Sequence, residues 1–290
     1  MRKKALIMAA CVCALLALAT GALAYLVLHR VEGHYFDSAG VRIHYTDEGQ
    51  GEPLLLVHGL GATADLNWRL PGITRMLARH FRVIAMDIRG HGLSGKPEDS
   101  SQYGTQMVDD VVRLMDHLKI KRVHIAGYSM GGFIALNLLA HHPDRVCCAA
   151  ICAAGWKDPE DDSPLGNVKS PPAVPLAAAE ASALGFLTRA GHLIVGGMAN
   201  TTSPPYVRHA CWQHLHDLLI PKTLIEQSPV PMMCLCGTND FLRPCAEALK
   251  SAAPGVEFVS VKGATHLNTP MCGDFKRNLL AFFRGHSCEQ

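Results

Sequence analysis

Short apolar runs alternate with segments of helical periodicity along most of this chain. The runs that resemble buried strands cover residues 53–59, 81–87, 123–127, 146–154, 230–236 and 256–261. Helical spacing extends over residues 70–80, 107–118, 131–141, 246–252 and 273–284. Strands that alternate with helices form a parallel sheet with right-handed crossovers, which place helices on both faces. The sequence therefore predicts an α/β fold with a doubly wound, mostly parallel sheet.

Two regions depart from this alternation. Residues 34–49 alternate apolar and polar side chains around Ser38-Ala39-Gly40, which predicts an antiparallel hairpin before the parallel part. From Gly155 to about Ser228, prolines repeatedly interrupt segments of helical character. Long insertions between strand-helix units commonly shape an active site. We therefore expect residues 155–228 to form a small helical lid.

The first thirty residues have the character of a membrane segment. Three basic residues precede an unbroken apolar and small-residue run from Ala5 to Leu28, which is long enough to span a bilayer as a helix. A signal peptide cut near Ala22-Leu23-Ala24 and an uncleaved anchor both fit, and the run continues past the cut, which favours the anchor. A lipoprotein signal ending at Cys11 is a weaker alternative, because the apolar stretch before it is short. We expect residues 1–30 to be a membrane anchor or signal peptide. From the charge difference across the run, we expect the domain formed by residues 31–290 to lie outside the cytoplasm, either anchored or exported.

Charge and cysteine usage narrow the classes of function. A net charge of +2 with interspersed signs gives no basic stripe, so no nucleic-acid partner is expected. The eleven cysteines raise the question of disulfides. Several of them lie in strand-like apolar runs, where we interpret them as small buried side chains: Cys147, Cys148, Cys152, Cys234 and Cys236. Because paired Cys-x-x-Cys motifs are absent from the sequence, no structural metal site is predicted.

The segment Gly127-Tyr128-Ser129-Met130-Gly131-Gly132 lies between a predicted strand and a predicted helix. Here a serine on a sharp strand-to-helix turn exposes its hydroxyl, while flanking glycines allow other backbone to pass closely. The helix that follows directs its N–H groups and positive dipole end toward the same place, which favours a developing oxyanion. A glycine-rich turn with an incidental serine is the alternative. The strand before and the helix after favour Ser129 as a nucleophile.

A nucleophilic serine needs a general base, because its hydroxyl reacts poorly at its own pKa. His266 directly follows the last predicted strand, at the carboxyl end where open α/β sheets place their chemistry. Asp240 has the equivalent position after the preceding strand. The order serine, aspartate, histidine is typical of one large class of hydrolases. We expect Asp240 to orient His266, with Asp158 as the reserve candidate for the acid.

With these motifs, residues 34–283 resemble the α/β-hydrolase superfamily, especially its small esterases, lipases and enol-lactonase-like or haloperoxidase-like members. His58-Gly59-Leu60-Gly61 is similar to the oxyanion loop of that family, and residues 87–95 to one of its conformational loops. The resemblance implies an oxyanion hole formed by the backbone N–H groups of Leu60 and Met130. It also implies a structural role for Asp87 and Arg89. The lid matches no subfamily motif, so the substrate does not follow from the resemblance.

The expected activity is that of a serine hydrolase that cleaves carboxylic esters through an acyl-enzyme, with no cofactor and no metal. The substrate would be a small-molecule ester or a lipid, and the N-terminal segment would be the contact with a membrane. Hydrolysis of a carbon–carbon bond or a lactone, and perhydrolysis, are alternatives because they can use the same triad. A non-catalytic binding protein on the same fold is a further alternative, although such proteins often lose part of the triad.

Overall fold

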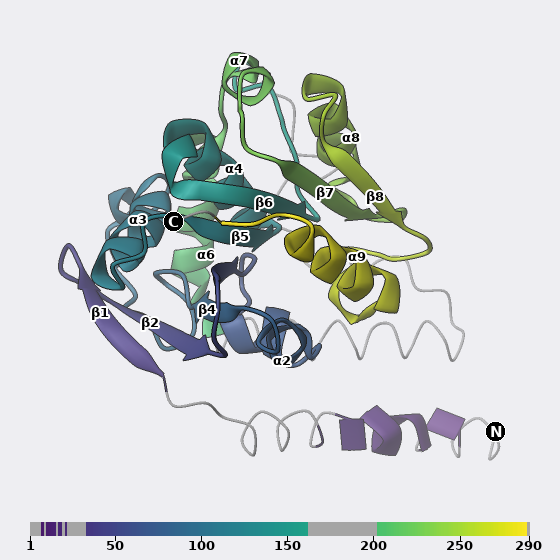
Figure 1. Ribbon diagram of the computed structural model, residues 1–290. Helices are drawn as coiled ribbons and strands as arrows, with labels where there is room; N and C mark the ends of the chain where they lie inside the picture. Colours follow the sequence, from purple (N-terminus) through teal and green to yellow (C-terminus); the bar gives the residue numbers. More distant parts are fainter. Residues whose placement is uncertain are drawn as a thin grey trace.

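The computed structural model describes residues 33–161 and 202–288, together with residues 7–8, 10–15, 17–18 and 21 near the start of the chain. Among them, eight strands form one sheet in the order β1-β2-β4-β3-β5-β6-β7-β8 (Figure 1). The strands are β1 (His34–Ser38), β2 (Val41–Glu48), β3 (Pro53–Val57), β4 (Arg82–Met86), β5 (Val123–Tyr128), β6 (Val146–Cys152), β7 (Met232–Gly237) and β8 (Glu257–Val261). The pairs β1–β2 and β2–β4 are antiparallel, and all others are parallel. The predicted hairpin and mostly parallel sheet are confirmed.

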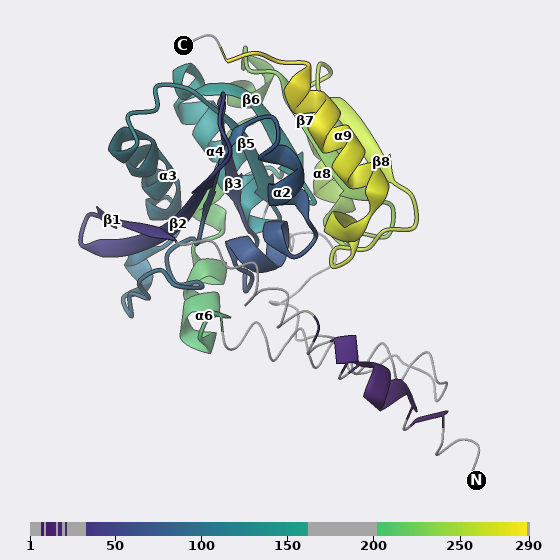
Figure 2. The same ribbon diagram turned by 60° about the horizontal axis from the view of Figure 1, so that its bottom comes forward.

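Helices cover both faces of the sheet (Figure 2). The helices on one face are α3 (Gln106–His117), α4 (Met130–His141) and α8 (Arg243–Ala252). Those on the other face are α2 (Ile73–Leu77) and α9 (Gly273–Arg284). Strand β3 shows why its sequence is continuously apolar: Leu55 and Val57 enter one core, and Leu54 and Leu56 enter the other. The sheet is therefore doubly wound, as predicted.

The helix predicted over residues 70–80 is wrong at its start. A π-helical turn (η1) covers Asp65–Arg69, and α2 begins only at Ile73. Gly72 between them has φ 81°, a left-handed conformation that a helix interior does not accommodate. The chain therefore turns at Pro71-Gly72 and packs the fully buried Trp68 against the sheet.

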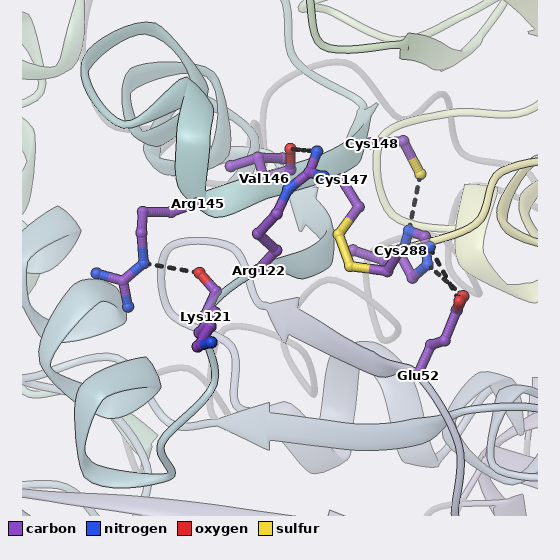
Figure 3. Close-up of a disulfide and its surroundings, with 9 residues drawn as sticks. Glu52, Lys121, Arg122, Arg145, Val146, Cys147, Cys148 and Cys288 are labelled. Atoms are coloured by element: carbon purple, nitrogen blue, oxygen red, sulfur yellow. Dashed lines mark hydrogen bonds and ion pairs between the residues drawn. A yellow bond between two sulfur atoms is a disulfide. The ribbon is translucent and has the colours of Figure 1, made fainter. Parts of the chain in front are cut away.

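All five cysteines interpreted as small buried side chains are buried, but one of them is not a free thiol. The buried free thiols are Cys148, Cys152, Cys234 and Cys236, as expected. Cys147, by contrast, forms a disulfide with Cys288, 141 residues away (Figure 3). The amide of Cys288 also donates to Glu52 Oε1 at 2.9 Å, just before β3. The end of the chain is thus attached to the sheet by a contact that no local sequence pattern indicates.

The lid and the membrane segment fall partly outside the described residues. Within the predicted lid, α6 (Pro205–Gln213) and α7 (Lys222–Glu226) are helical, whereas residues 162–201 lie outside the described part. Most of the run from Ala5 to Leu28, including the possible cleavage site, also lies outside it. Over the residues that the structure describes, no helix combines the length and apolar character needed to cross a membrane.

Candidate active site

Ser129 lies on the sharp turn between β5 and α4. Its backbone has φ 54° and ψ −117°, a conformation in which a non-glycine residue is strained. A side chain at Gly127 would overlap the backbone of Gly131, and one at Gly131 would overlap the carbonyl of Val57 in β3. The Ser129 amide donates to Cys152 O at 2.8 Å, which fixes the turn against β6. The glycines are therefore required by close backbone approach, and the turn presents the serine hydroxyl at the carboxyl end of the sheet.

Three predicted side chains meet at this turn. His266 Nε2 lies 2.9 Å from Ser129 Oγ. On the other side of the imidazole ring, His266 Nδ1 lies 2.9 and 3.0 Å from the two carboxylate oxygens of Asp240. Since a carboxylate only accepts, Nδ1 carries the proton and Nε2 is free to accept from the serine hydroxyl. The structure thus joins Ser129, His266 and Asp240 in one hydrogen-bonded relay.

The acid and the base differ in their exposure. The Asp240 side chain is fully buried and also accepts from the amide of Leu242 at 2.9 Å, whereas the His266 side chain is 15% exposed.

Two aromatic residues contact His266. The Phe241 ring lies against the imidazole, with centroids 4.3 Å apart. The Tyr128 hydroxyl donates to the carbonyl oxygen of His266 at 2.5 Å. Burial raises the pKa of Tyr128, so this hydroxyl remains a donor.

The reserve acid, Asp158, is placed elsewhere. Its side chain is exposed, and its carboxylate accepts from the amide of Glu160 at 3.0 Å, in a local turn. Asp240 therefore occupies the acid position beside His266.

The predicted oxyanion loop lies directly against the serine turn. A Cβ on Gly59 would come within 3.1 Å of the Ser129 Cβ, so the loop and the turn are in contact. Met130 is the first residue of α4, and its N–H precedes the first intrahelical hydrogen bond. Within the described residues, neither the Leu60 nor the Met130 amide donates a hydrogen bond to another group. The structure places both predicted donors beside Ser129, and their role in catalysis stays a prediction.

Asp87 and Arg89 are buried in networks consistent with the expected structural role. Asp87 accepts from the amides of Ala64 and Leu93 and from His44 Nδ1, at 2.9, 3.0 and 3.0 Å. Although burial opposes ionisation, the hydrogen bonds from His44 and from the amides of Leu93 and Ala64 hold the pKa of Asp87 below its usual value. Arg89 forms a bidentate pair with the fully buried Asp110, at 2.7 and 2.6 Å.

Several residues that contact this site carried no separate sequence prediction. In the sequence, Tyr128 stands out only as part of the serine motif, and His58 and His91 only as members of two loop motifs. Asn67, whose Oδ1 accepts from the Gly59 amide at 3.0 Å, had no motif at all. The neighbouring glycines are the only local indication, because His91 and Tyr128 reach partners 30 and 138 residues away.

Metal ligation was tested on the same part of the chain. Among residues 33–161 and 202–288, no cluster of three or more histidine, cysteine, aspartate or glutamate side chains could hold a metal ion.

Comparison with known proteins finds the same fold in several of them. The sequence-family model described as the alpha/beta hydrolase fold matches residues 52–189. The chain is 41% identical over 116 residues to 2-hydroxymuconate semialdehyde hydrolase of Pseudomonas sp. (strain CF600), a match covering 39% of this chain and 40% of that protein. It is 29% identical over 233 residues to 2-hydroxy-6-oxo-6-(2'-aminophenyl)hexa-2,4-dienoic acid hydrolase of Metapseudomonas resinovorans, covering 74% and 77%. The chain therefore aligns with less than half of the first of these relatives and about three quarters of the second.

A solved structure extends the similarity to most of the chain. The enol-lactonase from Burkholderia xenovorans LB400 superposes with a TM-score of 0.66 and 25% identity, over 87% of this chain and all of the other. This chain has the α/β-hydrolase fold, and the proteins to which it is similar include hydrolases built on that fold.

Proposed function

We propose that this protein is a serine hydrolase that cleaves carboxylic esters through an acyl-enzyme intermediate. The observation that carries the proposal is the relay from Ser129 through His266 to Asp240, with a hydrogen bond of about 3 Å at each step. The relay supports ester cleavage because it provides a nucleophile, a base and a group that orients the base.

The reaction begins when Ser129 Oγ attacks the ester carbonyl and His266 Nε2 takes the hydroxyl proton. Asp240 holds the Nδ1 proton and stabilises the imidazolium cation that results. The amides of Leu60 and Met130 then donate to the oxyanion of the tetrahedral intermediate. His266 returns the proton to the departing alcohol oxygen. In the second half-reaction, His266 activates a water molecule that hydrolyses the acyl-enzyme and regenerates the serine.

The test is hydrolysis of p-nitrophenyl esters from acetate to palmitate by the full chain in mild detergent. We expect turnover by the wild type and a loss of at least a thousandfold in Ser129→Ala. The chain-length profile separates an enzyme for small esters from a lipase. Absence of serine-dependent turnover at every length, from protein shown to be folded by circular dichroism, would refute the ester proposal.

Carbon–carbon bond hydrolysis is the second candidate, and the relatives favour it. The names of both curated relatives describe hydrolases of semialdehyde or dienoic acid substrates. Such substrates present a carbonyl to the same relay, with a stabilised carbanion as the leaving group in place of an alcohol. The assay follows the loss of 2-hydroxy-6-oxohexa-2,4-dienoate absorbance beside the ester series. A kcat/KM at least a hundredfold higher on the dienoate than on any ester would make carbon–carbon hydrolysis the main activity.

We also propose that residues 1–30 hold the catalytic domain, residues 31–290, at a membrane outside the cytoplasm or direct its export. The unbroken apolar run and the basic residues before it support this arrangement. Attachment would bring the site to lipid esters. Fractionation of cells that produce the full chain, with protease added from outside, tests both the attachment and the side of the membrane.

A further inference from the structure

The amide of Leu60 has its direction set by the peptide units on either side of it. In a trans peptide, C=O and N–H point in opposite directions. The Gly59 carbonyl belongs to the same peptide unit as the Leu60 N–H, and it accepts from His58 Nδ1 at 2.8 Å. The next peptide unit ends in the Gly61 N–H, which donates to His91 Nε2 at 3.1 Å. Two histidines therefore fix the two peptide planes that meet at Leu60.

Both histidines are neutral with the same proton arrangement. His91 Nδ1 faces the carbonyl oxygen of Arg89 at 3.1 Å and must donate, which leaves Nε2 as the acceptor for Gly61. His58 Nε2 likewise accepts from the amide of Ile88 at 3.0 Å. Both side chains are fully buried, and burial lowers the pKa of each, that of His91 to about 3. At neutral pH His91 is therefore a permanent acceptor.

His91 is itself held rigidly. Its neighbour Gly92 has φ 52°, and a side chain at that position would overlap the Asp87 carboxylate. That carboxylate also accepts from the amides of Ala64 and Leu93, so it joins the loop that carries His91 to the loop that carries Leu60. An imidazole in such a frame fixes an amide direction far better than a mobile water molecule would.

We propose that His91 is a positioning residue for the oxyanion hole. It acts through the Gly61 amide to keep the Leu60 N–H directed at the position of the oxyanion beside Ser129. The inference rests on the proposed serine chemistry, but it applies to any substrate whose carbonyl is attacked by Ser129.

Two substitutions separate the two hydrogen bonds of His91. In His91→Asn, the shorter amide keeps a donor near the position of Nδ1 for Arg89 O and loses the acceptor for Gly61. In His91→Gln, the longer side chain keeps an acceptor near the position of Nε2. His124→Asn is the control, because His124 is a fully buried histidine near the start of β5, with partners Glu52 and Cys148. This control variant shows how much the loss of a buried imidazole changes stability when the oxyanion loop is not involved.

The full chain in detergent is assayed in two ways: by p-nitrophenyl butyrate kinetics and by the rate at which a fluorophosphonate labels Ser129. Labelling also develops negative charge in the oxyanion hole, so it does not depend on the natural substrate. We expect His91→Asn to lower kcat and the labelling rate ten- to a hundredfold while KM changes less than twofold, because a misdirected donor no longer meets the transition state. We expect His91→Gln to stay within threefold of wild type, and His124→Asn to lower the melting temperature without changing either rate.

Labelling of His91→Asn at the wild-type rate, or equal losses in the Asn and Gln variants, would overturn the inference. If His91→Asn does not fold, His91→Leu replaces it, since leucine fills a similar volume without an acceptor. Wild-type protein that labels at Ser129 but hydrolyses no ester would refute only the ester proposal, and the labelling comparison would still decide the role of His91. Wild-type protein that neither labels nor turns over would overturn both.

Discussion

Substitution of Asp240 by asparagine reverses the proton arrangement of the relay with a minimal change of shape. The carboxylate now accepts from His266 Nδ1 through both oxygens, at 2.9 and 3.0 Å. An asparagine amide in that place can donate to Nδ1, which favours the tautomer with its proton on Nε2. That nitrogen lies 2.9 Å from Ser129 Oγ and must accept for the serine to react. The variant should therefore fold normally and fail as a catalyst.

The expected loss is large because Asp240 has little freedom to adapt. Its side chain is fully buried, and Oδ1 also accepts from the amide of Leu242 at 2.9 Å. That amide contact favours an asparagine with its oxygen at the Oδ1 position and its NH₂ at the Oδ2 position, which lies 3.0 Å from His266 Nδ1. Serine proteases with the same relay lose about 10⁴-fold in kcat when the aspartate becomes asparagine, or about 5 kcal/mol of transition-state stabilisation. We expect a loss of the same order here.

The assay is kcat and KM for p-nitrophenyl butyrate, with fluorophosphonate labelling of Ser129 as the measure of nucleophile activation. Asp158→Asn is the matched control, because Asp158 is exposed and lies in a local turn with Glu160. Its kcat should stay within twofold of wild type. A loss smaller than tenfold in Asp240→Asn, or a comparable loss in Asp158→Asn, would refute the assignment of the acid.

Three further predictions concern the frame around the site, and each is checked by urea unfolding monitored by circular dichroism. Asp110→Asn should lower the free energy of unfolding by about 3 kcal/mol, because it leaves the buried Arg89 guanidinium without its charged partner; a loss under 1 kcal/mol would contradict this. Cys288→Ser should cost about 2–4 kcal/mol, because the bond to Cys147 closes a loop with a sequence separation of 141; equal stability of the variant and the oxidised wild type would contradict it. Burial lowers the pKa of His91 from its ordinary 6.5 to about 3, so below pH 6.5 the unfolded chain binds a proton that the folded chain does not. As the pH is lowered from 6.5 to 3, the free energy of unfolding should therefore fall by up to about 1.4 kcal/mol per pH unit, and by less in His91→Gln. Identical pH slopes for the wild type and His91→Gln would refute the assignment of His91 as a neutral buried group.

The sheet and the serine turn could be predicted from the sequence because their determinants are local. All six residues of β5 are buried, and most of them are apolar or small. The glycines beside Ser129 are required by backbone contacts that only glycine allows. His266 and Asp240 could be selected because each follows a strand at its carboxyl end. In each case the pattern and its structural cause lie within a few residues of each other.

The remaining features depend on contacts between distant segments. His91 meets Gly61 across 30 residues, and Tyr128 meets His266 across 138. Such pairs leave no periodicity in the sequence, because a hydrogen bond between two loops depends on how both loops are packed. The start of α2 was misplaced for a different reason: helical spacing continued through Pro71-Gly72, where backbone conformation overrides side-chain pattern.

The sheet order explains which part of the site depends most on side-chain contacts. Strand β3, which leads into the Leu60 loop, is adjacent to β5, so the oxyanion loop reaches Ser129 through direct strand pairing. His266 follows β8, three strands from β5, a separation of roughly 14 Å at the usual strand spacing. Its loop must therefore return over β7 toward β5, where Asp240 holds the imidazole and Tyr128 holds the carbonyl. The serine and the oxyanion loop are placed by the sheet, whereas the base is placed by two side chains: Asp240, which follows β7, and Tyr128, at the end of β5.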